Sequence, residues 1–158
     1  MLLTYILQGR PEAAPLNPIA RYTWVFPWVE SAHICGFSLL VGTALILDLR
    51  LMGVWFKKQS VSQLASQLSP WILTGLMVVL TTGPYLLSSD VHEYVQVPAF
   101  KVKMVLLGLA ILFHFLVVQK ATHPSRDGFP LGWRKLAGGI SLSLWLGVVI
   151  GGLWIGNL

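Results

Sequence analysis

The sequence has very few charged residues. Asp, Glu, Lys and Arg make up 11% of its 158 residues, whereas 55% are hydrophobic. A water-soluble domain of this size needs far more polar surface, so the composition excludes a soluble globule and predicts an integral membrane protein. The formal net charge is +5. Because the basic residues fall in short segments between apolar runs, they are predicted to set the orientation in the membrane and not to bind nucleic acid.

Cysteine and the common catalytic motifs are scarce or missing as well. Cys35 is the single cysteine, so an intrachain disulfide is excluded, and we expect it to be a small buried residue. The sequence has no Gly-rich phosphate loop, no Cys-x-x-Cys-His haem attachment site and no nucleophile with a base at suitable spacing. These absences favour a non-catalytic electron-transfer or accessory subunit over an enzyme.

Four apolar segments are each long enough to cross a bilayer, which takes about 20 residues. They cover residues 28–56, 70–88, 100–118 and 136–156. We therefore predict an all-α integral membrane fold, a bundle of four transmembrane helices forming a single domain over residues 1–158. Residues 1–27 contain four prolines and are predicted to be a short, irregular interfacial segment. Residues 61–68 have helical apolar spacing and are predicted to lie in the interface, with the second span starting at Pro70.

The distribution of Lys and Arg predicts the orientation of the bundle. More of them follow the first and third spans than lie on the other side of the membrane. The richer side holds Lys57, Lys58, Lys120, Arg126, Arg134 and Lys135, and the poorer side holds Arg10, Arg21, Lys101 and Lys103. Since basic loops stay in the cytoplasm, both termini are expected outside.

The first span carries the strongest candidate site. Ionisable residues inside a span are costly and are functional candidates by default. Glu30 and His33 are three residues apart and share a helix face, on the same side of the membrane as His92 and Glu93 in the second loop. Imidazole and carboxylate groups bind borderline metals, and two imidazoles are a common axial pair for b-type haem. We predict His33 and His92 as cofactor ligands and Glu30 as a further metal ligand; alternatively, Glu30 only hydrogen-bonds His33 and fixes the helix to a neighbour.

Three further polar residues lie toward the opposite side. His114, near the far end of the third span, is too distant to share a site with His33. It is a candidate cofactor ligand on its own, with a hydrogen-bonded packing role as the favoured alternative. Arg50 is expected to reach the headgroups. Asp48 is expected to accept hydrogen bonds from Arg50, Lys57 or a neighbouring helix.

The fourth span is rich in glycine. Gly147 and Gly151, and then Gly152 and Gly156, are four residues apart. This spacing brings helices close together in lipid. It predicts that the fourth span makes the closest helix contact, either within the bundle or with a second copy or another membrane protein.

The runs VESAHICGFSLLVGTALILDLRLMGVWF, SPWILTGLMVVLTTGPYLL, PAFKVKMVLLGLAILF and SLSLWLGVVIGG resemble an uncharacterised family of small bacterial inner-membrane proteins, a domain of unknown function. The most specific parts are Glu30-Ser31-x-His33, Asp48-Leu49-Arg50-Leu51, Pro70-Trp71 and Lys103. The resemblance implies a bacterial inner membrane and supporting, structural roles for Asp48, Arg50 and Lys103. At a greater distance, the four-span plan is similar to four-helix transmembrane cytochromes b and to the copper-resistance D membrane domain, which implies haem or copper.

These observations predict a membrane redox or metal-handling subunit. It would bind a b-type haem or a metal near the outer side and pass electrons between a partner and the quinone pool or a neighbouring haem. The alternative is a cofactor-free accessory or scaffold subunit of a larger membrane complex, and a small transporter comes third. The expected partners are the lipid bilayer and either another membrane protein or a second copy of the chain.

Overall fold

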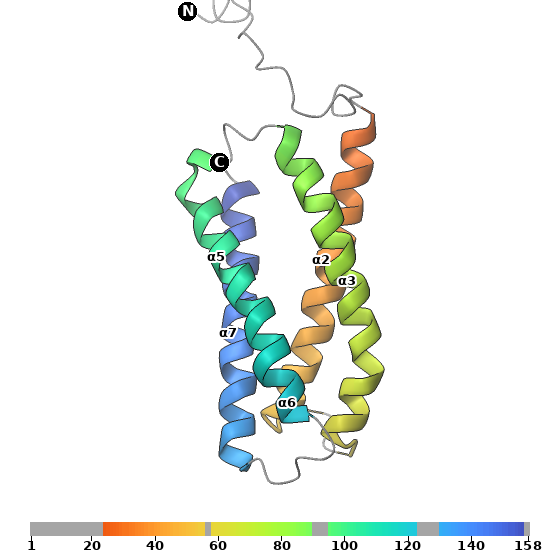
Figure 1. Ribbon diagram of the computed structural model, residues 1–158, viewed down its shortest axis with the longest axis vertical. Coiled ribbons are helices and arrows are strands. Elements are labelled where there is room, and N and C mark those ends of the chain that lie inside the picture. Colours follow the sequence, from red (N-terminus) through yellow and green to blue (C-terminus); the bar gives the residue numbers. More distant parts are fainter. Residues whose placement is uncertain (1–23, 56–57, 90–94, 123–129, 157–158) are drawn as a thin grey trace, which may run out of the picture.

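A computed structural model describes residues 24–55, 58–89, 95–122 and 130–156 of the chain (Figure 1). These residues form α2 (Val25–Leu51), α3 (Val61–Ser89), α5 (Pro98–Phe113) and α7 (Leu131–Gly156). The third of these helices continues through a π-helical turn, η2 (His114–Val118), into α6 (Gln119–Thr122). Four helical segments are long and apolar enough to cross a membrane, as predicted. The all-α membrane fold is confirmed.

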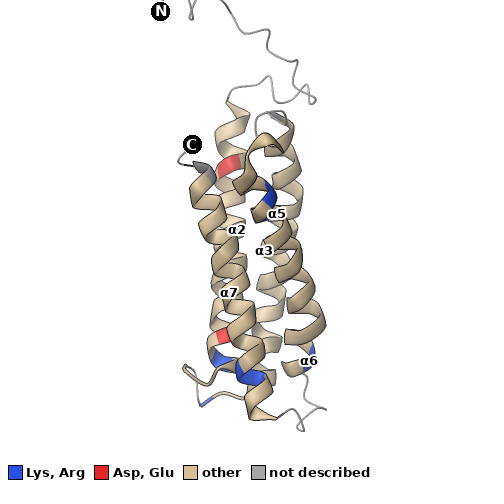
Figure 2. Cartoon of the chain, turned by 90° about the vertical axis from the view of Figure 1, so that its left-hand side faces the viewer, with Lys and Arg blue, Asp and Glu red and all other residues tan. Residues whose placement is uncertain are grey.

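The four segments run up and down in one elongated bundle (Figure 1). Helix α2 packs most extensively against α3 and also against α7, and α5 packs against α7. The start of α2 and the end of α7 lie at the same end, which we call the upper end because Figure 1 draws it at the top. In the described part of the chain, most Lys and Arg residues gather at the lower end (Figure 2). This is the side that the sequence predicts to be cytoplasmic.

Helix α3 differs from its predicted form. It begins at Val61 and passes through both Pro70 and Pro84, so residues 61–68 are not a separate interfacial helix. The reason is that the apolar face of this stretch docks on the bundle: Val61 and Leu64 are buried, and Leu68 packs against the core. Because tertiary packing stabilises the turn on either side of it, Pro70 is tolerated inside the helix despite its missing donor.

Helix α2 ends earlier than predicted, at Leu51. Gly53 follows with a positive φ of 75°, a conformation that glycine adopts without steric cost. Arg50 does not simply extend toward headgroups, since its Nε and Nη2 donate to the carbonyl of Gln59 at 2.9 and 2.5 Å. The last turn of α2 thereby holds the start of α3 in place.

Small residues set the distances between the helices. A Cβ atom on Gly75 would lie 2.8 Å from the carbonyl oxygen of Gly36, so α2 and α3 are in backbone contact there. A Cβ on Gly138 would lie 2.8 Å from the carbonyl oxygen of Asp48, which brings α7 equally close to α2. The prediction that the fourth span makes the closest helix contact is therefore wrong, because α3 approaches α2 at least as closely as α7 does, and α7 makes its own close contact through Gly138 and not through the later glycines. Gly151 faces α5, where its Cβ would lie 3.2 Å from that of Lys103.

Cys35 is exposed on the surface of α2, contrary to the expectation that it is buried. The sequence could not show this, because a span that is apolar on every side does not reveal which residues face the bundle.

Candidate functional site

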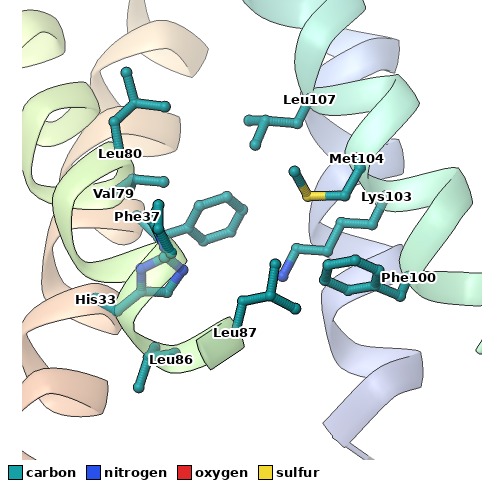
Figure 3. Close-up of a pocket in the computed structure, with 12 residues that line it drawn as sticks. His33, Phe37, Val79, Leu80, Leu86, Leu87, Phe100, Lys103, Met104 and Leu107 are labelled. Carbon is teal, nitrogen blue, oxygen red and sulfur yellow. The ribbon is translucent and has the colours of Figure 1, made fainter. Parts of the chain in front are cut away.

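A cavity of about 300 Å³ lies in the upper half of the bundle, between α2, α3 and α5 (Figure 3). Its walls are almost entirely apolar. The two polar side chains that line it are His33 from α2 and Lys103 from α5. In Figure 3 they extend toward the cavity from opposite sides. The remaining lining residues are Phe37, Val79, Leu80, Gly83, Pro84, Leu86, Leu87, Phe100, Met104 and Leu107.

His33 is held in place by a hydrogen bond to α3. Its Nδ1 lies 2.7 Å from Oγ1 of Thr82, and that hydroxyl in turn donates to the carbonyl of Val78 at 2.6 Å. Because the hydroxyl proton is used on Val78, we assign the proton of the imidazole to Nδ1, which donates to Thr82. The neutral ring then has a lone pair on Nε2, which can accept a proton or bind a metal.

The imidazole fits closely against the backbone of α3. A Cβ atom on Gly83 would lie 3.4 Å from Cε1 of His33. Pro84, the next residue, has no N–H and so cannot donate to the carbonyl of Leu80, one turn below. Leu80 also lines the cavity. Gly83 and Pro84 therefore both lie in the cavity wall, beside the histidine.

Lys103 crosses from α5 toward the other wall. Its Nζ lies 5.8 Å from the centre of the Phe37 ring, within the range of a cation–π interaction. Its stem packs on Gly151, and a Cβ on Gly152 would lie 3.3 Å from Nζ. Two glycines of α7 thus leave the space that the lysine occupies. Among the described residues, no carboxylate forms an ion pair with Lys103.

The cavity opens sideways. Leu80 of α3 and Met104 of α5 both line it, and they are also 50% and 47% exposed on the outside of the bundle. Both residues lie well inside the membrane-spanning helices. An apolar molecule could therefore enter from the lipid between α3 and α5, without passing through water.

The residues predicted to share a site with His33 are not found beside it in the described structure. Glu30 is exposed, and the hydrogen bond of the imidazole goes to Thr82, a partner that the sequence interpretation missed. His92 and Glu93 lie outside the described residues, so ligation by His92 stays a prediction. Within the described ranges, no three side chains of His, Cys, Asp or Glu come together in a way that could hold a metal ion.

A second group of polar residues is buried in the lower half of the bundle. Asp48 of α2 is 0% exposed, Ser141 of α7 is 1% exposed and His114 of η2 is 3% exposed. Ser141 lies beside the carboxyl group of Asp48. Both carboxyl oxygens, the Ser141 hydroxyl and Nδ1 of His114 have no hydrogen-bond partner among the described residues. Of the predicted partners of Asp48, Arg50 is bound to Gln59, Lys57 lies outside the described residues, and the neighbouring helix α7 places Ser141 beside the carboxyl group.

His114 begins the π-helical turn. The N–H of Gln119 donates to the carbonyl of His114 five residues back. Such wide turns are rare and frequently mark functional sites. The ring of His114 packs edge-on against Phe115, with centroids 5.6 Å apart. His114 is buried, as its packing role requires, but its predicted hydrogen bond is not seen at Nδ1.

Comparison with known proteins assigns the chain to a family. A family model matches residues 20–158, nearly the whole chain. The chain belongs to DUF6644, a family of unknown function. The predicted membership of such a family is confirmed. Searches of curated proteins and of solved structures each found no match.

The DUF6644 match includes both the cavity and the buried polar group, since it begins at residue 20. Sequence reasoning identified His33, Asp48 and Lys103 but not their surroundings. It missed Thr82 and Ser141, because hydroxyl residues are common in membrane helices and satisfy themselves on their own backbone. The sequence features that could have pointed to them are their neighbours: Thr82 precedes Gly83-Pro84, and Ser141 follows Gly138-Gly139 after one residue.

Proposed function

We propose that this DUF6644 protein is a redox subunit of the bacterial inner membrane that binds a quinol or quinone in the upper cavity. The proposal is supported above all by one observation: an imidazole and an ammonium group face an otherwise apolar cavity from opposite walls (Figure 3). Ligand sites typically combine apolar walls with a few polar groups that fix the orientation of the ligand.

The chemistry of the two groups suits a flat ring with an oxygen at either end. Nε2 of neutral His33 can accept the proton of one quinol hydroxyl, and the ammonium of Lys103 can donate to the oxygen at the other end. Phe37 and Phe100 supply aromatic surface for the ring. An apolar tail would leave through the opening beside Leu80 and Met104, toward the lipid.

The redox step uses the same groups. Oxidation of quinol to quinone releases two electrons and two protons; one proton passes to Nε2 of His33 and the other to water at the upper membrane surface. The electrons pass to a partner redox protein. Reduction of quinone is the reverse. The Thr82 hydrogen bond holds the proton of the ring on Nδ1, which leaves Nε2 free to act as the base.

A b-type haem or a metal ion is the second candidate occupant, favoured by the same free Nε2. Histidines that ligate metals usually donate their other N–H to a neighbouring oxygen, as His33 does to Thr82. His92, the predicted opposing ligand, lies outside the described residues. Lys103 argues for the quinol, because an ammonium group donates to oxygen but has no lone pair for iron.

The test is quinone binding by the purified protein in nanodiscs, with a short-tailed ubiquinone analogue. Lys103→Met should weaken binding about 10- to 150-fold, which corresponds to the roughly 1.5–3 kcal/mol of a hydrogen bond to a charged group. Lys101→Met is the matched control, since Lys101 is exposed on the same helix and does not line the cavity. Thr82→Val should also weaken binding, whereas Thr81→Val, whose hydroxyl bonds only its own helix, should not.

Two results would reject the quinol. One is quinone retention no greater than by empty nanodiscs. The other is equal binding by the Lys103→Met and Lys101→Met proteins. An absorption spectrum of protein purified gently from its own membrane tests the haem: a Soret band that is lost in His33→Ala would put haem in place of the quinol.

A further inference from the structure

We infer that Asp48, Ser141 and His114 form an internal, water-containing site that binds a proton in the lower half of the bundle. These three residues come from α2, α7 and η2, and none of them takes part in the cavity described above. Each is more than nine-tenths buried, and each has a side-chain polar atom without a hydrogen-bond partner among the described residues.

The packing of the helices brings the three residues to one level. Gly138 contacts the carbonyl of Asp48, and Ser141, almost one turn above Gly138, lies beside the Asp48 carboxyl group. On the other side, Gly151 faces Lys103 and Gly147 faces Leu106. Extending this antiparallel pairing by two more turns brings His114 level with residues 139–141, and η2 does pack against α7.

The unpaired polar atoms include both hydrogen-bond acceptors and hydrogen-bond donors, and this combination indicates which ligand the site can bind. Oδ1 and Oδ2 of Asp48 accept, Oγ of Ser141 can donate or accept, and Nε1 of Trp145, one turn above Ser141, can only donate. A metal cation would be repelled by the indole N–H. Water satisfies both kinds of group, and buried waters are held by polar groups that would otherwise be unpaired. The set therefore fits water that carries a proton to Asp48.

Among the described residues, no ion pair to Asp48 is seen, so a proton is a suitable counter-ion. The facing end of α3, residues 61–69, carries no charged residue, and Lys120 of α6 is exposed. On α2 Arg50 is engaged by Gln59; on α7 the nearest basic residue is Arg134, about one turn below Gly138, whose buried Nε has no hydrogen-bond partner among the described residues. A buried carboxylate is costly unless it is paired or neutralised. Because Asp48 lies only one turn from the end of α2 at Leu51, the proton would come from the lower surface.

The site is separate from the quinol cavity, and its test does not depend on that proposal. Leu107 is the cavity residue nearest to His114 along the third segment, and seven residues, about 10 Å, separate them. The experiment uses quinone-free protein. A negative result here therefore does not count against quinone binding in the cavity, and a lack of quinone binding does not count against this proton site.

The experiment is infrared difference spectroscopy of the full chain in an ester-free detergent, in H₂O and after exchange into D₂O. We expect a carboxylic acid C=O band that shifts in D₂O, because water reaches the site. The band should be absent in Asp48→Asn and unchanged in the control Glu30→Gln, which alters an exposed carboxylate on the same helix.

Ser141→Ala keeps the carboxyl group and provides a second test should Asp48→Asn fail to fold. It should move the C=O band, since it removes the hydroxyl beside the carboxyl. The inference is overturned if wild-type protein shows no such band, if the band does not shift in D₂O, or if Ser141→Ala leaves its frequency unchanged.

Discussion

Replacing Gly75 with alanine tests whether the contact between α2 and α3 sets the geometry of the bundle. The added Cβ would lie 2.8 Å from the carbonyl oxygen of Gly36 and 2.8 Å from the backbone nitrogen of Leu40. Both are backbone atoms of α2, so no side chain can rotate away. The helices must separate by about 0.6 Å to bring these contacts to an ordinary distance of 3.4 Å.

The cost of this separation can be worked from general packing energies. A gap of 0.5–1 Å already removes about a quarter to a half of the dispersion energy of the contacts it opens. Overpacking of a well-filled core costs about 1–3 kcal/mol. Gly42→Ala on α2 is the control, because its Cβ would meet nothing within 4 Å. Replacing a helical glycine with alanine stabilises the helix by about 0.5–1 kcal/mol in either variant. This gain cancels in the comparison, so the two variants should differ by the overpacking cost, about 1–3 kcal/mol.

The assay is unfolding in mixed detergent micelles, followed by circular dichroism for wild type, Gly75→Ala and Gly42→Ala. Gly75→Ala should unfold at the lowest and Gly42→Ala at the highest fraction of denaturing detergent. Equal stability of the two alanine variants would refute the reasoning, because it would mean that the Gly36–Gly75 contact does not hold α2 and α3 at their distance.

Two more predictions concern the lower end and the orientation of the chain. Arg50→Met should destabilise the protein by about 1 kcal/mol, the usual net value of a hydrogen bond, because it removes the donors to Gln59. Lys58→Met, at an exposed neighbouring position, should have no measurable effect in the same unfolding assay. In a Cys35→Ser background, a single cysteine at Gln59 should be labelled by a membrane-impermeant thiol reagent from the cytoplasmic side, and one at Trp24 from the outer side. Labelling in the reverse sense would contradict the orientation inferred from Lys and Arg.

The number and type of the helices followed from the sequence because each span is a long apolar run, which is a local property. The boundaries were less predictable. Whether residues 61–68 lie in the interface or extend α3 depends on whether their apolar face meets lipid or the bundle, and the spacing is the same in both cases. The early end of α2 depends on Gly53 and on the hydrogen bonds of Arg50, which involve residues on both sides of the turn.

The candidate site was predictable only in part, for a similar reason. His33 and Asp48 stood out because ionisable residues in a span are rare. Their partners, Thr82 and Ser141, come from other helices, and no local pattern pairs them. Lys103 was expected to have a structural role, but its place in the cavity depends on the gap between α3 and α5. The π-helical turn at His114 leaves no mark that can be read in the sequence.

The uneven packing of the four helices has a mechanical consequence. The bundle consists of two helical hairpins, α2 with α3 and α5 with α7, which are joined mainly along α2 and α7. On the opposite side, α3 contacts the third segment through α6, at the lower end (Figure 1). The angle between the hairpins is therefore set mainly by the protein contacts along α2 and α7. Because the cavity opens between α3 and α5, we expect the acyl chains of the bilayer to cover this opening, and the thickness and composition of the bilayer should influence the width of the cavity.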